Sequence, residues 1–469
     1  MKLNQIFNCE YQTEICELTA DSRKKVNNGL YFCLVGSLDG HEFASEAIKN
    51  GAVALVCEHK LDIDVPQIIV SDSRQAMTDA AAAFYFHPER KLKLIGITGT
   101  NGKTTTSFIV KSILECYKKN VAVIGTNGIF YKDRQLPSAL TTPDPIELFE
   151  ALRYLSDDGA EYVVMEVSAH AAALKKVSGV HFEAAAFTNL TQDHLDYFAD
   201  MERYYAAKES FLLGDNRRVI INADDAYGLR LLSKITKSFS YGYDNPSDVF
   251  GINLEMSEHG LSYVLNLMDE IINVKFSLPG RFNMYNTMCA AAICYSLGVP
   301  ASVIEEGIKR VKKVDGRFNI INTTSCSIII DFAHTDDGLK NVLKAIREFS
   351  RGKIITVFGC GGNRDKSKRA KMGKAAAEES DYVVITSDNP RYEPPMDIIL
   401  EAEKGVGDCP HSLIEERKEA IRFAVRHAGK NDIVLIAGKG AEKYQDIAGT
   451  KIPYSDEDFV MQLVAEEGI

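Results

Sequence analysis

Features that would place a chain in a specialised class are missing from this sequence. The ten cysteines are scattered, with no C-x-x-C pair and no histidine cluster at zinc-ligand spacing, a pattern typical of reduced core residues in a cytosolic protein. No apolar run is long enough to span a bilayer, and residues 1–7 lack the apolar core of a signal peptide. We therefore expect a cytoplasmic protein without membrane insertion.

An excess of basic residues is missing as well. Lys and Arg number 54 against 65 Asp and Glu, a formal net charge of −11. This argues against a general nucleic-acid or membrane surface, and we expect no nucleic-acid partner. Internal repeats and low-complexity linkers are absent too. The 469 residues, 45% apolar and 25% charged, fit a globular protein of about three domains.

A glycine-rich loop over residues 96–105 (GITGTNGKTT) carries the clearest chemical signal. Alternating polar and apolar residues at 91–97 predict a strand before it, and apolar residues at helical spacing predict a helix over 104–116. Glycines let the backbone fold closely around a polyphosphate, and the N–H groups that open a helix point at the anion. Lys103 can neutralise terminal phosphate oxygens, and the Thr104 hydroxyl can hold magnesium.

The spacing of this loop departs from the strict P-loop pattern, because Ile97 stands where its first glycine would fall. A bare glycine turn is the alternative interpretation. The order of strand, loop, Lys-Thr pair and helix favours nucleotide binding.

The periodicity along the chain predicts an α/β fold in three domains. Strands at 30–35 and 52–57 with a helix at 42–50 predict a small α/β N-terminal domain over residues 1–89, for which we expect a binding role.

Two larger domains follow in the prediction. Residues 90–315 are expected to form a central P-loop ATPase-like domain with a mostly parallel sheet, from strands such as 121–125, 162–167 and 184–190 that alternate with helices. Residues 316–469 are expected to form a C-terminal Rossmann-like α/β domain with four further apolar strands. Its own glycine turn completes no dinucleotide fingerprint.

Polar residues follow the predicted central strands. Glu166 and His194 lie at or just past strand ends, and doubly wound sheets bind ligands at such carboxyl ends. A carboxylate and an imidazole beside a P-loop indicate magnesium–ATP chemistry, with both residues as candidate ligands of a second metal. Taken singly, each is better explained as a buried, hydrogen-bonded polar group.

Ordered matches over essentially the whole chain carry a family resemblance. The chain resembles the Mur ligases, the ATP-dependent amino-acid ligases of peptidoglycan synthesis, and most of all the branch that adds the third residue of the muramoyl peptide. The matching stretches are DSR at 21–23, TGTNGKTT at 98–105, TTP at 141–143, MEVS at 165–168, FTNLT at 187–191, DHLDY at 193–197, YAAK at 205–208, GRFN at 280–283, DGR at 315–317, DFAH at 331–334, GCGGNRD at 359–365, DNPR at 388–391 and GKG at 438–440.

The resemblance implies a reaction and a nucleotide site. Such enzymes use ATP to phosphorylate the substrate's terminal carboxylate; the amine of an incoming amino acid attacks this acyl phosphate, and a tetrahedral intermediate loses phosphate to leave an amide. The implied catalytic residues are Lys103, His194 and a carbamylated Lys208. Magnesium would be held by Thr104, Glu166, His194 and the Lys208 carbamate, and ATP by Gly99, Thr100, Asn101, Gly102, Lys103, Thr104, Thr105, Asn286, Arg317 and Asp331. Without the resemblance, a solvated surface lysine on a helix at 201–213 is the ordinary interpretation of Lys208.

A substrate site is implied in the same way. The residues matching contacts to UDP-N-acetylmuramoyl-dipeptide are Ser22, Thr141, Thr142, Ser168 and Lys176. Ala169 replaces a usual second serine. Lys176 stands where arginine is common, which keeps the positive charge but loses the bidentate grip.

The DNPR motif indicates which amino acid is added. In the family it resembles the version that reads meso-diaminopimelate, whose distal end carries a carboxylate beside an amine. Arg391 can hold that carboxylate through two parallel hydrogen bonds, with Arg364 as a second cation and Glu442 for the distal ammonium. A solvated loop arginine is the alternative interpretation of Arg391. The implied amino-acid site comprises Arg364, Asp388, Asn389, Pro390, Arg391, Gly438 and Glu442, with Ala441 where the family often has His.

Rival interpretations stay open. The same ligase could add L-lysine, although lysine would leave Arg391 facing an unpaired positive charge. A related dipeptide- or folate-extending ligase is a further alternative, of which the folate type is disfavoured because such enzymes lack a uridine-binding first domain of this kind. A non-catalytic nucleotide-binding protein on the same fold would have no need to keep Lys103, Glu166, His194 and Lys208. We expect a monomer that acts with magnesium, ATP, UDP-N-acetylmuramoyl-dipeptide and meso-diaminopimelate.

Overall fold

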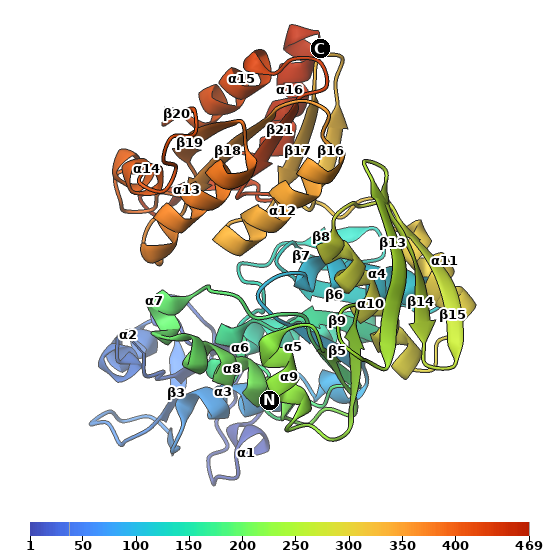
Figure 1. Ribbon diagram of the computed structural model, residues 1–469. Helices are drawn as coiled ribbons and strands as arrows, with labels where there is room; N and C mark the ends of the chain where they lie inside the picture. Colours follow the sequence, from blue (N-terminus) through green and yellow to red (C-terminus); the bar gives the residue numbers. More distant parts are fainter. Residues whose placement is uncertain (37, 469) are drawn as a thin grey trace. The chain divides into compact units, whose positions relative to one another are not determined.

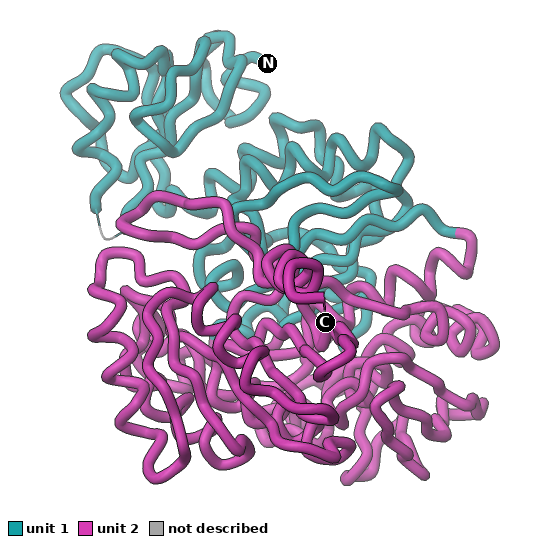
Figure 2. Tube along the Cα trace, turned by 90° about the horizontal axis from the view of Figure 1, so that it is seen from above, with its two compact units in different colours: residues 1–98, 119–185, 207–219 teal, residues 99–118, 186–206, 220–469 magenta. Residues whose placement is uncertain are grey.

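Strands and helices alternate along the chain, as the sequence pattern predicts, and build three α/β parts (Figure 1). The computed structural model describes residues 1–36 and 38–468. Close contacts group them into two units, coloured separately in Figure 2. Unit 1 is formed by Met1–Thr98, Lys119–Ala185 and Ala207–Val219, and unit 2 by Gly99–Lys118, Ala186–Ala206 and Ile220–Ile469.

The first part of unit 1 is a four-stranded parallel sheet in the order β1-β2-β3-β4. Buried apolar residues such as Tyr31 and Leu55 form its core. The strands are β1 Glu17–Thr19, β2 Gly29–Phe32, β3 Ala52–Cys57 and β4 Gln67–Ile69, and the helices are α1 Leu3–Ile6, η1 Gly40–Phe43, α2 Ala44–Lys49, α3 Ser73–Phe84 and η2 Pro88–Arg90.

The second part of unit 1 contains the strand that leads into the glycine-rich loop. Strands β5, β9 and β6 pair in parallel in that order, and two short antiparallel strands, β7 and β8, follow β6. The three parallel strands are almost entirely buried, as expected from continuous apolar runs. The elements are β5 Lys93–Thr98, β6 Val121–Gly125, β7 Gly128–Tyr131, β8 Arg134–Leu136, α5 Pro145–Asp157, β9 Tyr162–Glu166 and α6 Ala169–Ala173.

Unit 2 begins with the loop and its helix, α4 Lys103–Cys116. Helices α10 Arg281–Ser296 and α11 Ala301–Arg310 pack against α4. Three strands that the sequence analysis does not predict form an antiparallel meander, β13 Val249–Ser257, β14 Gly260–Leu267 and β15 Glu270–Phe276. The remaining elements are α7 Leu195–Phe198, α9 Ala226–Leu232 and β12 Ser238–Gly242, while the chain passes from one unit to the other within β10 Ala184–Phe187, α8 Met201–Leu212 and β11 Val219–Asn222.

The C-terminal part of unit 2 is a six-stranded sheet in the order β16-β17-β21-β18-β19-β20, parallel except for β16. The strands are β16 Asn319–Asn322, β17 Ser327–Asp331, β18 Ile354–Cys360, β19 Tyr382–Ser387, β20 His411–Leu413 and β21 Ile433–Ala437. Helices cover both faces: α12 Asp336–Phe349, α13 Ser367–Glu379 and α14 Pro395–Glu403 on one, and α15 Arg417–His427 and α16 Asp456–Glu467 on the other (Figure 1). A hairpin of β22 Tyr444–Ile447 and β23 Thr450–Pro453 completes the part.

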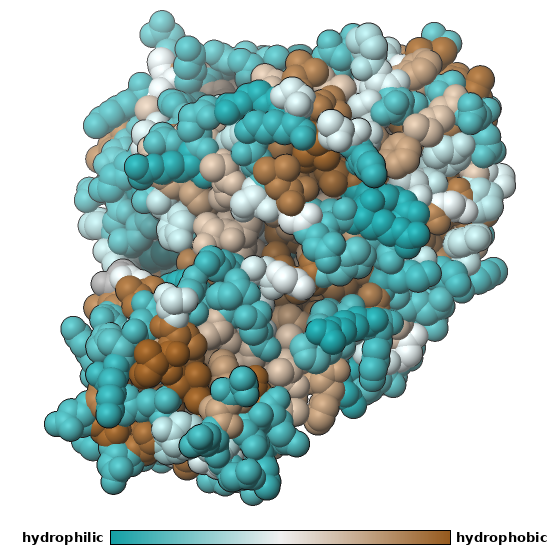
Figure 3. Space-filling view, turned by 90° about the horizontal axis from the view of Figure 1, so that it is seen from below, coloured by the Kyte–Doolittle hydropathy of each residue, from teal (hydrophilic) through white to brown (hydrophobic). Residues whose placement is uncertain are grey.

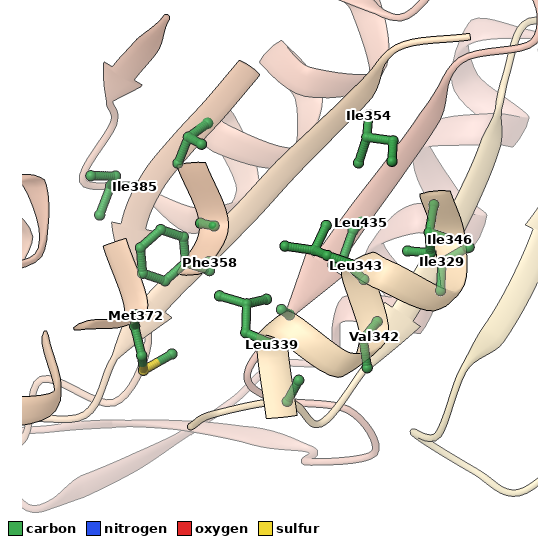
Figure 4. Packing of buried hydrophobic residues seen from close by; sticks show 14 of the residues in the cluster. Ile329, Leu339, Val342, Leu343, Ile346, Ile354, Phe358, Met372, Ile385 and Leu435 are labelled. Atoms are coloured by element: carbon green, nitrogen blue, oxygen red, sulfur yellow. The ribbon is translucent and has the colours of Figure 1, made fainter. Parts of the chain in front are cut away.

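Alternate residues of the buried strands supply the two cores of this sheet. Ile329 packs with Leu339, Leu343 and Ile346 of α12 (Figure 4), whereas its neighbour Ile328 belongs to the cluster on the opposite face. The chain returns to place β21 between β17 and β18, so the strand order reverses there. Loops at the carboxyl ends of β21, β18 and β19 therefore meet at the edge where such sheets bind ligands.

The surface is mainly polar on the face drawn in Figure 3, with separate apolar patches. Within residues 1–36 and 38–468, no helix is both long enough and apolar enough to cross a membrane.

Candidate active site

The glycine-rich loop depends on its glycines for two close approaches. Gly99 has a φ of +148°, and a Cβ built there would lie 1.8 Å from Thr188 Oγ1; Gly102 has a φ of +86°, and its Cβ would lie 2.3 Å from Asn286 Oδ1. Any other residue would clash and be strained. The segment after β10 holds the loop, because Thr188 Oγ1 donates to the Asn101 carbonyl at 2.7 Å and the Asn101 N–H donates to Asn189 Oδ1 at 2.9 Å.

Lys103 and Thr104 open α4 directly after this loop. Lys103 Nζ donates to the carbonyls of Gly99 and Thr100, at 2.9 and 2.8 Å, so the cation lies over the loop. Thr104 and Thr105 are buried in the first helical turn. The predicted loop residues therefore come together at the start of α4, where the N–H groups of a helix N-terminus and a lysine can meet an anion.

The C-terminal part reaches this loop within unit 2. Arg317 Nη2 donates to Thr104 Oγ1 at 2.8 Å. Asp331 supports the Arg317 segment, since its carboxylate oxygens accept from the N–H groups of Phe318 and Ala333, both at 2.8 Å. Burial raises the pKa of Asp331, against the lowering effect of Arg317. Of the predicted ATP residues, Asn286 and Arg317 thus lie against the loop, and Asp331 acts behind Arg317.

His194 lies beside Asp193, whose carboxylate is surrounded by three basic side chains. His194 Nε2 is 3.3 Å from Asp193 Oδ2, and Lys368 and His334 of the C-terminal part lie 3.6 and 3.8 Å from the same carboxylate. Burial by itself would raise the pKa of Asp193, but His194, Lys368 and His334 hold it well below its ordinary value. Asp193 therefore stays ionised next to the candidate metal ligand.

Unit 1 brings most of the predicted substrate residues together around Glu166. This carboxylate is 1% exposed and accepts from the Thr126 N–H and hydroxyl, both at 3.1 Å. Thr142 Oγ1 donates to the Glu166 carbonyl at 2.8 Å and lies 3.3 Å from Ser168 Oγ. Lys176 donates to the Thr142 carbonyl at 3.2 Å and pairs with Asp144 at 2.7 Å, while Thr141 bonds Thr126 at 3.1 Å.

Two other predicted residues stand apart from that cluster. Ser22 donates to Glu46 and its carbonyl accepts from Asn50; among the described residues it makes no hydrogen bond to the Glu166 cluster. Lys208 lies on α8 and is 1% exposed, which contradicts its interpretation as a solvated surface lysine. The helix face that carries Lys208 packs inward, a fact that helical periodicity alone does not determine.

The predicted amino-acid site forms at the carboxyl edge of the C-terminal sheet. Arg391 has a φ of +51°, and its Nη1 donates to the Gly362 carbonyl at 2.5 Å. A Cβ built at Gly361 would lie 3.0 Å from Arg391 Nη1 and 3.8 Å from Arg364 Cγ, so both arginines border the same turn. Arg391 is partly buried and tied to the turn, which contradicts a freely solvated loop arginine.

The predicted amino-acid site also contains two acidic residues, Asp388 and Glu442. Asn389 Nδ2 donates to Glu442 Oε2 at 3.0 Å. Gly438, with a φ of +117°, brings its backbone so close that a Cβ there would lie 2.8 Å from Asp388 Oδ2. Pro390 stands between Asn389 and Arg391 and fixes the direction of the loop.

Sequence reasoning misses two residues of this site. Lys439 is fully buried and bonds Asn389 and Glu442, at 3.0 and 2.9 Å. Its position between two glycines at the end of an apolar strand is a signal that could have found it. Asp446 lies 3.9 Å from Arg391 Nε, and one of its oxygens is buried without a hydrogen bond among the described residues; no sequence pattern marks it.

A cavity and groups of possible metal-binding side chains are two further features that can mark a functional site. A cavity of about 250 Å³ in unit 1 is lined by residues such as Asp79, His87 and Arg90, none of which is a predicted site residue. In the described part of the chain, no three His, Cys, Asp or Glu side chains are grouped so as to hold a metal by themselves.

Known proteins resemble this chain over its whole length. The Mur ligase middle domain matches residues 97–294, and the Mur ligase glutamate ligase domain matches residues 316–440. The UDP-N-acetylmuramoyl-L-alanyl-D-glutamate–2,6-diaminopimelate ligases of Clostridium acetobutylicum (number 1) and Geobacillus kaustophilus are each 41% identical to it, covering 97% of this chain and 96% of each relative. A solved structure of a ligase with the same name has a TM-score of 0.71 at 28% identity, covering 100% of this chain and 99% of that one. The chain therefore belongs to the Mur ligase family.

Proposed function

We propose that this protein is an ATP-dependent amide ligase that adds meso-diaminopimelate to UDP-N-acetylmuramoyl-L-alanyl-D-glutamate in peptidoglycan synthesis. Relatives 41% identical over 97% of the chain carry the name of that reaction. The observation within the chain that carries the proposal is a divided site at one sheet edge. Arg391 and Arg364 border one turn, and the Asn389–Glu442 pair supplies an anion beside them, which suits an amino acid whose distal end has a carboxylate and an ammonium.

The nucleotide half of the reaction is assigned to the loop before α4. The Lys103 ammonium lies over this loop, and the N–H groups that open α4 favour an anion such as an ATP triphosphate. The peptide carboxylate attacks the γ-phosphorus, ADP leaves, and an acyl phosphate forms. The amine of diaminopimelate then attacks the acyl carbon, and phosphate leaves with one oxygen of the original carboxylate. Lys103 and Arg317 supply positive charge where these anions meet.

Magnesium is the second requirement of this proposal. When bound, it would screen the phosphate charges and polarise the phosphoryl group. We assign it to Thr104, Glu166, His194 and a carbamylated Lys208. The hydroxyl and carboxylate oxygens suit a cation that prefers oxygen ligands. A carbamate also fits the burial of Lys208 at 1% exposure, because it replaces a buried ammonium by an anion that can pair with the metal.

The remaining assignments follow the family pattern. We propose residues 1–89 as the UDP-substrate-binding domain, with Ser22 as a contact, residues 90–315 as the ATP-binding ligase domain, and residues 316–469 as the amino-acid-binding domain. Thr141, Thr142, Ser168 and Lys176, gathered near Glu166, are assigned to the muramoyl peptide. The reaction consumes ATP, so we place it in the cytoplasm, in a monomer whose single chain carries every assigned residue.

A choice between amino acids tests the proposal. The purified protein is incubated with ATP, magnesium and UDP-N-acetylmuramoyl-L-alanyl-D-glutamate, and with meso-diaminopimelate or L-lysine in parallel. Mass spectrometry of the product is expected to show the diaminopimelate adduct, with ADP and phosphate formed in equal amounts. A preference for lysine would overturn the amino-acid assignment. If the protein consumes ATP neither with meso-diaminopimelate nor with L-lysine, the non-catalytic interpretation is favoured.

A further inference from the structure

Lys439 is a buried lysine to which the reaction assigns no role. It lies between Gly438 and Gly440, directly after β21, and its side chain is 0% exposed. A buried ammonium loses its hydration, which is unfavourable unless its three N–H donors find acceptors. Lys439 Nζ lies 3.4 Å from Asp388 Oδ1, 3.0 Å from Asn389 Oδ1 and 2.9 Å from Glu442 Oε2. All three acceptors belong to the proposed amino-acid site.

Glu442 is held by one of its two carboxylate oxygens. Oε2 accepts from Lys439 Nζ and also from Asn389 Nδ2, at 3.0 Å. A turn fixes the backbone, since the Glu442 N–H donates to the Lys439 carbonyl at 2.9 Å. No described residue donates a hydrogen bond to Oε1. One oxygen is thus anchored, and the other keeps its capacity to accept from a ligand.

The sheet explains why a long cation is needed at this position. Asp388 and Asn389 follow β19, whereas Lys439 and Glu442 follow β21, and β18 lies between these two strands. The Lys439 side chain therefore crosses the carboxyl end of β18 to connect two loops. Gln445 and Asp446 also bond the Asp388–Asn389 loop, but the Glu442 side chain itself is held there only by Lys439 and by its hydrogen bond from Asn389, among the described residues.

The charge of the group also fits a cationic ligand. Burial alone would raise the pKa of Asp388, but Lys439 and Arg417 hold it below its ordinary value, so the carboxylate is ionised. One ammonium then stands between two carboxylates, those of Asp388 and Glu442. The excess negative charge favours an ammonium ligand over a neutral one.

We propose that Lys439 is a positioning residue for amino-acid selection, which anchors Glu442 Oε2 and Asn389 so that Glu442 Oε1 receives the distal ammonium of the incoming amino acid. The inference rests on the proposed function. In this proposal, the distal ammonium is recognised by a Glu442 side chain that hydrogen bonds from Lys439 and Asn389 hold in place. Lys439 is therefore predicted to act through Glu442.

The test is a steady-state comparison of Lys439→Met, Glu442→Gln and the double variant with the native protein. Lys439→Met is expected to raise the KM for meso-diaminopimelate by about tenfold or more, with the KM values for ATP and the UDP-linked dipeptide changed less than about twofold. The double variant is expected to have about the KM of the worse single variant, because both changes remove the same contact. KM effects that multiply, or a change shared equally by all three substrates, would overturn the role.

Controls separate this inference from folding and from the proposed function. Lys443→Met removes an exposed lysine four residues further on, which pairs with Asp458, and it is expected to leave every KM unchanged. Thermal unfolding monitors the fold, and Lys439→Gln, which keeps an N–H donor, repeats the test in a milder form. If neither Lys439 variant folds, the residue belongs to stability and the positioning role is wrong. If the native protein forms no diaminopimelate adduct, the proposed function fails instead.

Discussion

Lys208 is a lysine withdrawn from solvent on a helix that is otherwise partly exposed. Its 1% exposure keeps the side-chain amine away from bulk solvent. A neutral amine is nucleophilic and can take up carbon dioxide, whereas an ammonium cannot. Carbamylation would leave an anion with two oxygens, the type of ligand that magnesium prefers. Burial thus supports the residue's proposed modification, which its sequence position alone does not.

Replacing Lys208 tests that assignment. Lys208→Ala is expected to lower ligase activity by about 10–100-fold or more, because a metal ligand is lost, while the folded protein still binds the UDP-linked dipeptide. Lys237→Ala, which removes an exposed lysine, serves as the matched control and is expected to keep native activity. Phosphate release and equilibrium binding are measured on the same preparations. Full activity of Lys208→Ala would contradict the carbamate role.

Some individual site residues can be predicted from the sequence, whereas others cannot. Lys103, Thr104 and Arg317 are identified from motifs, and they lie together in unit 2. Lys439 is missed because lysine is usually exposed, whereas the structure shows that its side chain is buried. A motif names a residue type; the acceptors that surround it come from other parts of the chain.

At the scale of single elements, the proposed site residues lie on short loops at strand ends. The loop before α4 requires two glycines, and the turn after β18 is clamped from both sides. Arg369 of α13 pairs with Glu393 at 3.0 Å and donates to the Gly361 carbonyl at 3.3 Å. The helix thus ties the Gly361 turn to the loop that carries Arg391. The sequence predicts the strands that flank these loops but not this connection.

Gly102→Ala tests the close approach in the nucleotide loop. We expect ATP affinity to fall by about tenfold or more, because the new methyl group would push Asn286 and the loop apart. Gly298→Ala is a matched control: its φ of +82° is close to the +86° of Gly102, but nothing lies within 4 Å of its Cβ. It is expected to lower stability by about 1 kcal/mol without weakening ATP binding. Equal ATP affinity in both variants would contradict the steric account.

The Arg369–Glu393 ion pair, called the clamp below, is expected to make the free energy of unfolding depend on pH. Hydrogen bonds from Arg369 lower the pKa of Glu393 to about 2. Because the folded pKa lies below the unfolded value of about 4.3, this pair contributes stability above that value and loses it as the pH falls towards 2. The free energy of unfolding, measured by urea titration at pH 5 and pH 3, is expected to fall more in the native protein than in Glu393→Gln.

The matched control for the pH test is Glu466→Gln, which removes an exposed glutamate whose only described partner is Gln462. Its acid sensitivity is expected to equal that of the native protein. If Glu393→Gln loses as much stability between pH 5 and pH 3 as the native protein does, the clamp is not ionised as described.

The sequence analysis misses the antiparallel strands β13, β14 and β15 for a physical reason. Strands β13, β14 and β15 alternate between buried and exposed residues, for example along β15, yet the sequence analysis expects only strands that alternate with helices. A meander needs no helical crossover, so the expectation of a parallel sheet hides it. The parallel strands β17, β18, β19 and β21 are found correctly because each is a continuous apolar run.

At the scale of the whole molecule, three α/β parts serve three ligands in the proposed reaction. The similarity to diaminopimelate ligases over 97% of the chain supports this arrangement. Within unit 2, two contacts connect the nucleotide loop to the C-terminal part: Arg317 with Thr104 at 2.8 Å and Asn101 with Asp337 at 3.1 Å. ATP and the incoming amino acid are therefore assigned to two sites of one packed unit.

The most direct test of the account follows one oxygen atom. The substrate is UDP-N-acetylmuramoyl-L-alanyl-D-glutamate with oxygen-18 at both oxygens of its reacting carboxylate, incubated with the native protein, ATP, magnesium and meso-diaminopimelate. Transfer through an acyl phosphate predicts one labelled oxygen in each released phosphate for each amide formed. Amide formation with unlabelled phosphate, or labelled substrate that remains unchanged while ATP is consumed, would contradict the account.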